Sequence, residues 1–425
     1  MKILVVGSGG REHAILWALQ RTSARPLELL CAPGNAGIAE IARCVPIAAT
    51  DVTALASLAE DERVDLTVVG GEAPLARGIV DEFTTRGLRI VGPAASAARL
   101  EASKVFAKEF MARHRVPTAR FRVADSAEEA IAILRRGEFG GPEAPVVIKA
   151  DGLAAGKGVV VARDRAEAER AVQELMVQRR LGAAAARVVI EEALEGREAS
   201  VIFWTDGRAA RLMPPARDHK RVGEGDTGPN TGGMGAVTGP DVLDPATRER
   251  VVRQTVEPTL EGLRAEGLEF RGVLYLGLVL TPEGPRVLEY NVRLGDPEAQ
   301  AILVRLRSDL VAIFDAVAAG RLGETDVEWA DGASACVVLA ARGYPERVEM
   351  GAVIRGLKEA AEVSGVEIFH AGTERGPQGE WRTAGGRVLG VASAAPTLDQ
   401  ALARCYRAAE RISWEGLHYR RDIGR

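Results

Sequence analysis

The sequence predicts an α/β protein of several domains, beginning with a doubly wound parallel sheet. Its 425 residues are enough for two to four domains, and a hydrophobic content of 47% is ordinary for a globular chain. Within residues 1–103, short β-rich runs alternate with longer amphipathic ones. That alternation is typical of parallel strands with helices on both faces of the sheet.

The elements follow in order along the chain. In the first domain, strands are expected at residues 3–6, 27–31, 65–69 and 89–91. A helix is expected over 103–115, where Val105, Phe106, Phe110 and Met111 recur at helical spacing before Pro117 stops it. A small α+β lobe should follow, with strands at 146–149, 159–161 and 187–191 and a helix at 166–178.

The second half of the chain begins with a glycine-rich segment. Pro229 and Asn230 add helix-breaking character to residues 223–235, so this segment predicts a loop with neither helix nor strand. Beyond it we expect helices at 246–266 and 308–319, strands at 272–280 and 286–291, and a final domain from about Gly332.

Composition excludes several classes of partner. A net charge of −4 gives no positive field that would recruit nucleic acid or an anionic membrane, so small-molecule partners are expected. No apolar run approaches the roughly 18 to 20 residues of a membrane-spanning helix. The opening apolar run is too short for a signal peptide. The cysteines, which fit neither a zinc site nor a disulfide scaffold and predict the reducing cytoplasm, are Cys31, Cys44, Cys336 and Cys405.

A glycine turn follows the first expected strand. Backbone amides and a helix dipole can face an anion at residues 7–10, and Arg11 favours a phosphate there. An oxidoreductase would need glycine where Glu12 stands and a ribose-binding acid after the second strand. Glycines that merely allow a tight turn are the structural alternative.

A second glycine-rich stretch covers residues 149–158. It is not a Walker motif, because three residues separate Gly152 from Gly156 and Gly158 replaces the magnesium-binding Ser or Thr. Between two strands it predicts a hairpin flap that closes over a triphosphate, with Lys149 reaching the phosphates. A surface hairpin with solvated lysines is the alternative.

A polar face occurs on the strand expected at 286–291. The period of two places Glu289, Asn291 and Arg293 on one face. Carboxylate and amide oxygens suit magnesium, and Asp296 follows in a tight turn beside them. An exposed strand with alternating polar residues is the alternative.

Together these segments resemble the ATP-grasp superfamily, and within it the phosphoribosylamine–glycine ligase family. The similarity spans nearly the whole chain. The stretches that carry it are residues 7–13, 32–37, 72–75, 149–158, 218–223, 228–235 and 293–298.

The resemblance implies a division of the chain into an ATP-grasp architecture. Its parts are a Rossmann-like domain (1–103), a boundary helix with the start of ATP-grasp (104–121), a lid lobe (122–191), a central α+β domain (192–328) and a carboxy-terminal α+β domain (329–425).

The implied reaction joins glycine to 5-phospho-β-D-ribosylamine in purine biosynthesis. ATP would phosphorylate glycine to glycyl phosphate, and the amine would then displace phosphate to give glycinamide ribonucleotide and ADP. The implied cofactors are ATP and Mg²⁺, with Mn²⁺ as the alternative ion. We expect a cytoplasmic monomer that binds neither nucleic acid nor membrane.

The resemblance also implies roles for individual residues. Glu289 and Asn291 would hold the metal. Arg293 and Asp296 would orient glycine or its acyl phosphate, with Asp218 and Lys220 between the two half-sites. The residues implied for ATP are Lys104, Lys149, Gly156, Lys157, Gly158, Glu191, Glu192, Leu194 and Glu198. Those implied for the phosphorylated amine and its surroundings are Gly9, Gly10, Arg11, Asn35, Glu72 and Gly295.

Other functions remain as alternatives to the ligase. A nicotinamide-dependent oxidoreductase would have no need of the Glu289–Asn291 pair, and a nucleotide sensor would bind ATP without turning it over. Another ATP-grasp ligase, of the phosphoribosylaminoimidazole carboxylating type, is disfavoured by the loops at 218–223 and 228–235. His13 and His219 are expected to make structural hydrogen bonds rather than to catalyse.

Overall fold

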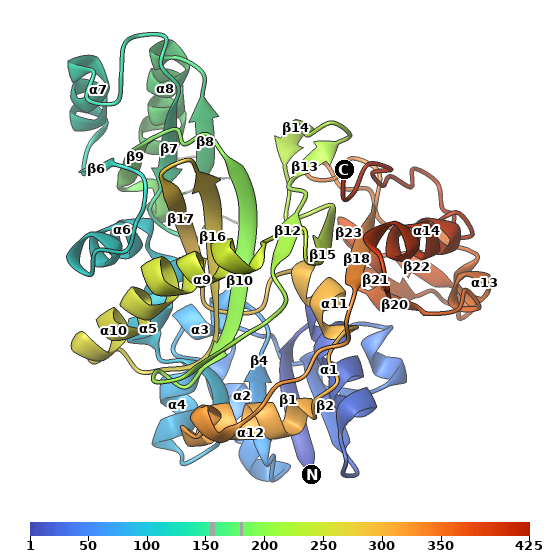
Figure 1. Ribbon diagram of the computed structural model, residues 1–425. Helices are drawn as coiled ribbons and strands as arrows, with labels where there is room; N and C mark the ends of the chain where they lie inside the picture. The colour runs from blue at the N-terminus through green and yellow to red at the C-terminus, as the bar shows by residue number, and fades with distance from the viewer. Residues whose placement is uncertain (154–157, 179–181) are drawn as a thin grey trace.

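The structure is a computed structural model that describes residues 1–153, 158–178 and 182–425. Figure 1 shows a first domain around β1, a lobe built from β6 to β9 that projects away from it, and a third group of elements around β18 and β23. In the described part of the chain, every helix is too short or too polar to span a bilayer.

The first domain confirms the predicted parallel sheet. Its strands, all parallel neighbours in the order β5-β4-β1-β2-β3, are β1 (Lys2–Gly7), β2 (Glu28–Pro33), β3 (Arg43–Cys44), β4 (Leu66–Val69) and β5 (Ile90–Pro93). Its helices are α1 (Gly10–Thr22), the short η1 (Ile38–Glu40), α2 (Val52–Asp61), α3 (Glu72–Ala76), α4 (Ile79–Thr85) and α5 (Ala95–Ala102).

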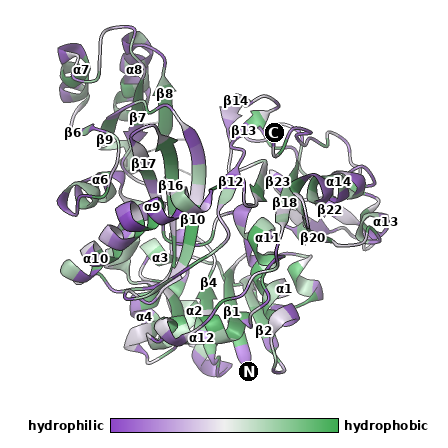
Figure 2. Cartoon of the chain, in the orientation of Figure 1, coloured by the Kyte–Doolittle hydropathy of each residue, from purple (hydrophilic) through white to green (hydrophobic). Residues whose placement is uncertain are grey.

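Side chains of β1 alternate between two hydrophobic cores. Leu4 and Val6 enter one core with residues of α2, α4 and α5, whereas Ile3 and Val5 enter another with residues of α1. Because a strand points successive side chains to opposite faces, a strand covered on both faces must be apolar throughout. Figure 2 shows this concentration of hydrophobic residues along β1, β2 and β4.

The lobe at residues 121–192 follows the predicted boundary helix. That helix is α6 (Lys104–Arg113), and the Ser103 hydroxyl caps it by accepting from Phe106 N. Antiparallel strands pair in the order β6 (Phe121–Ala124), β9 (Val188–Glu192), β7 (Val146–Ala150) and β8 (Val159–Ala162). Beside them lie α7 (Ala127–Arg136), α8 (Arg165–Val172), the π-helical η2 (Gln173–Val177) and the short η3 (Gly182–Ala185).

One continuous sheet joins the first domain to the rest of the chain. Antiparallel pairing of β5 with β16 extends it in the order β20-β23-β18-β15-β12-β10-β16-β5. The added strands are β10 (Arg197–Thr205), β11 (Ala210–Leu212), β12 (Ala216–Asp218), β15 (Gly235–Thr238), β16 (Phe270–Thr281), β17 (Gly284–Asn291), β18 (Ala333–Ala340), β20 (Val366–His370) and β23 (Arg387–Ala395). This shared sheet contains strands from several of the domains expected from the sequence. The limits of those domains stay a prediction.

The remaining elements are a small sheet and several helices. A further small sheet has the order β19 (Val353–Ile354), β22 (Trp381–Thr383) and β21 (Thr373–Arg375). The predicted helix at 246–266 consists of α9 (Pro245–Val251), the π-helical η4 (Val252–Val256) and α10 (Glu257–Ala265). The other helices are α11 (Glu298–Leu303), α12 (Leu310–Ala319), η5 (Leu322–Glu324), α13 (Leu357–Ala361) and α14 (Leu398–Ala409).

The prediction that residues 223–235 form a loop with neither helix nor strand was wrong. There β13 (Arg221–Gly223) and β14 (Thr227–Asn230) pair as an antiparallel hairpin. Gly225 and Asp226 make the turn with positive φ angles of 64° and 53°. Since every residue of β14 is exposed, the strand carries no alternation of apolar and polar residues. Hydrophobic periodicity could not have indicated it.

Candidate active site

A cavity of about 420 Å³ collects most of the predicted site residues. Those that line it are Arg11, Glu72, Lys104, Lys149, Gly158, Asp218, Lys220, Glu289, Asn291, Arg293 and Asp296. Those that do not are Gly9, Gly10, Asn35, Glu191, Glu192, Leu194, Glu198 and Gly295. Gly156 and Lys157 lie outside the described residues.

Strand β17 carries the predicted polar face. Glu289, Tyr290 and Asn291 all line the cavity. The Tyr290 side chain is buried, and its hydroxyl pairs with the hydroxyl of Thr259. Burial by itself raises the pKa of Glu289, yet Lys220, Lys149 and Lys104 together hold it below its ordinary value. Glu289 is therefore an ionised carboxylate at neutral pH.

The same face fits a hard metal ion that also binds phosphate oxygens. Glu289 supplies a carboxylate, and Asn291 supplies an amide oxygen that accepts from Arg293 Nη2 at 3.2 Å. Within the described ranges, no group of three or more His, Cys, Asp or Glu side chains could hold a metal. Magnesium sites often use one or two carboxylates and complete their shell with water and substrate phosphates. The donor set thus suits a metal that arrives with a nucleotide.

Arg293 is held by acids of the first domain. Its guanidinium contacts Glu72 at 3.3 Å and Glu101 at 2.8 Å. Glu101 also accepts from Val292 N at 2.8 Å, and burial raises its pKa. The sequence did not single out Glu101, which lies on α5 and lines the cavity. Arg293 therefore joins the end of β17 to α3 and α5 as well as facing the cavity.

Lys149 belongs to a buried group of charges. Its Nζ lies 3.0 Å from Glu191 Oε2, and Lys108 Nζ contacts the same oxygen at 3.1 Å. Lys149 also donates to Leu288 O at 3.1 Å. Lys108, which the sequence reasoning missed, lines the cavity one helical turn after Lys104 on α6. That i, i+4 spacing was the available signal.

Asp218, at the end of β12, and Lys220, just after it, line the cavity together with further acids. Lys220 Nζ contacts Glu198 at 2.8 Å. Burial raises the pKa of Asp218 to about 7, against the attraction of Lys220. Tyr275 and Glu298, also missed from the sequence, line the same cavity, and the Tyr275 hydroxyl donates to Glu298 at 2.6 Å. Glu298 closes the quoted stretch 293–298, and that membership was its signal.

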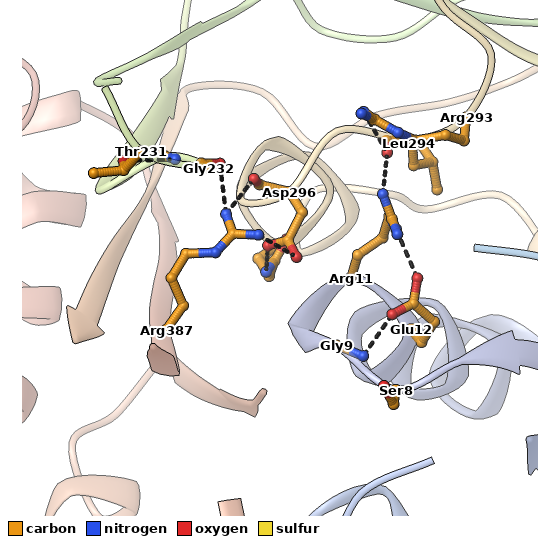
Figure 3. A network of polar contacts seen from close by, with 12 residues as sticks. Ser8, Gly9, Arg11, Glu12, Thr231, Gly232, Arg293, Leu294, Asp296 and Arg387 are labelled. Atoms are coloured by element: carbon orange, nitrogen blue, oxygen red, sulfur yellow. Dashed lines mark hydrogen bonds and ion pairs between the residues drawn. The ribbon is translucent and has the colours of Figure 1, made fainter. Parts of the chain in front are cut away.

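In the glycine turn before α1, a backbone amide is already bonded to a side chain of that helix. Gly9 N donates to Glu12 Oε2 at 2.6 Å, and Arg11 Nε contacts Glu12 Oε1 at 2.7 Å. Arg11 Nη1 also donates to Leu294 O at 3.1 Å (Figure 3). Asn35 holds loops together by donating to Ser8 O and His370 O. Of these residues, Arg11 reaches the cavity.

The predicted structural histidines accept hydrogen bonds from backbone amides. His13 Nδ1 accepts from His370 N at 2.9 Å, and His219 Nε2 accepts from Gly424 N at 2.9 Å. Burial lowers the pKa of each to about 4. Both rings are therefore neutral acceptors at pH 7, as a structural role requires.

Comparison with solved structures defines the class of protein. The chain is similar to the crystal structure of phosphoribosylamine–glycine ligase from Thermotoga maritima, with a TM-score of 0.85, 36% identity, and coverage of 99% of this chain and 100% of that one. It also shares its fold with biotin carboxylase from Campylobacter jejuni, with a TM-score of 0.72, 17% identity, and coverage of 98% and 92%. The family model for the phosphoribosylglycinamide synthetase ATP-grasp (A) domain matches residues 102–299. This is an ATP-grasp protein, and that fold implies use of ATP with a divalent metal.

The remaining matches define the family. Models for the phosphoribosylglycinamide synthetase N domain and C domain match residues 1–101 and 334–425. The phosphoribosylamine–glycine ligase of Xanthomonas axonopodis pv. citri is 50% identical over 100% of this chain and 97% of its own length. That of Pseudomonas aeruginosa is 48% identical over the same shares. The chain belongs to the phosphoribosylglycinamide synthetase family, as its motifs indicated.

Proposed function

We propose that this chain is a carbon–nitrogen ligase that joins glycine to 5-phospho-β-D-ribosylamine at the expense of ATP. The products would be glycinamide ribonucleotide, ADP and phosphate, within purine biosynthesis. The observation that carries the proposal is one cavity in which Lys104 and Lys149 face Glu289 and Asn291, with Arg293 beside them. The family membership and the names of the relatives support the choice of substrates.

The cations of the cavity suit a reaction between anions. Transfer of the γ-phosphoryl group of ATP to the glycine carboxylate forms glycyl phosphate, and both reactants are negatively charged. Lys104 and Lys149 would neutralise phosphate oxygens, while Gly158 lines the same cavity. Magnesium, or manganese as the alternative, would supply further charge neutralisation when held by Glu289 and Asn291.

The nucleotide base would be recognised by the segment after β9. Main-chain groups of Glu192 and Leu194 are proposed to pair with adenine, with Glu191 behind them. Glu198 is proposed to accept from the ribose hydroxyls, for which it would exchange its contact with Lys220. That exchange is feasible because Glu198 is 52% exposed and so pairs in solvent.

The second half-reaction needs a proton acceptor. As the ribosylamine nitrogen attacks the carbonyl of glycyl phosphate, the C–O bond to phosphate breaks and the nitrogen loses a proton. A carboxyl with a pKa of about 7 can accept that proton near neutral pH, and Asp218 lines the cavity with this property. Arg293 and Asp296 would orient the acyl phosphate.

The ribosylamine itself is proposed to lie at the first-domain end of the cavity. Arg11 would meet its phosphate beside the turn of Gly9 and Gly10, with Glu72 near its ribose. Asn35 would shape this end through the loops that it joins, and Gly295 through the turn before Asp296. We further propose that the enzyme acts in the cytoplasm as a monomer.

Release of phosphate from ATP tests this function. It is measured with glycine and freshly made phosphoribosylamine, each omitted in turn. Full release should require both, and formation of glycinamide ribonucleotide should match it mole for mole. Release that does not depend on glycine would sink the proposal. Release that requires bicarbonate and an aminoimidazole ribonucleotide would indicate the carboxylating ligase instead.

A further inference from the structure

Arg387, at the start of β23, reaches from the carboxy-terminal part of the chain into the cavity. Its Nη1 donates to Gly232 O and to Asp296 O, each at 2.6 Å. Its Nη2 donates to Asp296 Oδ2 at 3.0 Å. Figure 3 shows the guanidinium between these two loops, opposite Arg11. One side chain therefore connects three segments that are distant in sequence.

The fit around this guanidinium is close. A Cβ atom at Gly232 would lie 3.0 Å from Arg387 Cζ, so a larger residue there would push the guanidinium away. Gly233 has a φ of +116°, and a Cβ at that position would lie 2.5 Å from Pro297 Cδ. The glycines let the loop before β15 approach both Arg387 and the turn at Asp296.

The contacts of Arg387 lead to two residues assigned to the chemistry. Asp296 is held directly on one carboxylate oxygen, and Gln300 Nε2 donates to the other at 2.7 Å. Lys220 is held through the loop, because the neighbour of Gly232 is Thr231, whose N and Oγ1 donate to Lys220 O at 2.7 and 2.8 Å. Lys149, by contrast, is held by Glu191 and Leu288.

We propose that Arg387 is a positioning residue for the glycine and ribosylamine half of the reaction, which makes the carboxy-terminal domain part of the active site. Its guanidinium fixes the carboxylate of Asp296 and, through Gly232 and Thr231, the segment between β12 and β13 that carries Lys220. Because Nη1 and Nη2 of Arg387 already donate to protein atoms, Arg387 acts on the substrates through Asp296 and Lys220. This inference rests on the proposed ligase function.

Steady-state kinetics of Arg387→Ala test the inference. We expect kcat/KM for glycine and for phosphoribosylamine to fall by roughly 10- to 100-fold, the size of one or two charge-assisted hydrogen bonds. KM for ATP should stay within about threefold of wild type, because interactions of the nucleotide half are retained. Guanidinium ion, at concentrations too low to unfold the protein, should restore part of the lost activity.

Two further variants separate positioning from a general effect on folding. Arg387→Lys keeps the cation but cannot bond two carbonyls and a carboxylate in one plane, so an intermediate loss is expected even where Arg387→Ala does not fold. Arg375→Met is the matched control. Like Arg387, Arg375 reaches out of the carboxy-terminal part of the chain, but it pairs with Glu40 of the first domain and does not line the cavity. Its kinetics should match wild type.

Several outcomes would overturn the inference. Wild-type kcat/KM for both substrates in Arg387→Ala would do so, as would wild-type kinetics in Arg387→Lys. An equal weakening of the apparent affinity for all three substrates, ATP included, without rescue by guanidinium would show that Arg387 has only a structural role. These outcomes leave the proposed ligase untouched, since that function fails when wild-type protein shows no glycine-dependent phosphate release.

Discussion

Replacement of Lys108 by methionine would break a buried group of charges at the wall of the cavity. Lys108 and Glu191 have side-chain exposures of 2% each, and Lys149 contacts the same carboxylate. Lys108 also donates to Thr118 Oγ1 at 2.6 Å. In the part of the chain that the structure describes, Glu191 Oε1 has no hydrogen-bond partner. The carboxylate therefore depends on its two lysines.

The expected loss of stability can be worked out from these contacts. Removing one partner of a buried ion pair costs roughly 3 to 5 kcal/mol, because a buried charge is left under-compensated. Here Lys149 remains on Glu191. Burial, followed by the repulsion of Lys149, lowers the pKa of Lys108 to about 8, and that repulsion disappears in the variant. We therefore expect the lower end of the range, about 3 kcal/mol.

Urea unfolding of Lys108→Met, Glu191→Gln and the double variant measures this effect. The double variant should lose less than the sum of the single ones, since each single change removes the same Lys108–Glu191 ion pair. Lys358→Met, at an exposed position of α13, is the control and should stay within about 0.5 kcal/mol of wild type. Additive losses, or a loss below about 1 kcal/mol for Lys108→Met, would refute this reasoning.

Other predictions concern catalysis and pH. Glu289→Gln should reduce turnover on the order of 100-fold by removing a charge partner of the metal, and near-normal activity at saturating magnesium would contradict that role. Gly9→Val should raise KM for phosphoribosylamine, because its Cβ would lie 3.0 Å from Glu12 Oε2 and 3.5 Å from Asp296 Oδ2; an unchanged KM would move the phosphate site elsewhere. His219 has a folded pKa of about 4 against 6.5 unfolded, so the unfolded state binds more protons between these values. Its contribution to stability is complete above pH 6.5 and is lost as pH falls towards 4, with a slope of about 1.4 kcal/mol per pH unit. Urea unfolding of His219→Gln should show a shallower loss over this window, and an identical slope would refute the assignment.

Local patterns carried the prediction of most elements. The first four expected strands match β1, β2, β4 and β5 within two residues at each end. Tyr290 is buried between Glu289 and Asn291, as the period of two required. These succeed because burial on one or both faces imposes a periodic sequence. The sequence did not predict the hairpin β13–β14, because β14 is exposed, β13 is half-buried, and neither strand alternates apolar and polar residues.

Residues whose partners are distant in the sequence could not be predicted from local sequence patterns. Glu101 meets Val292 across 191 positions, and Arg387 meets Asp296 across 91. Their types and neighbours in the sequence gave no sign of these meetings. Asp296 was assigned from its motif, yet its carboxylate is held by a residue of the last domain. Side-chain partners at such separations depend on how whole elements pack.

The sequence by itself determined the parallel sheet of the first domain, the polar face of β17 and the family. Each of these depends on short periodic runs or motifs that can be recognised in the sequence alone. Only the tertiary structure decided that β5 pairs with β16 and so joins the domains in one sheet. It also decided that Arg387, Glu101 and Lys108 enter the cavity. The reason is that hydrophobic periodicity is a property of one element, whereas a cavity is formed by the packing of many.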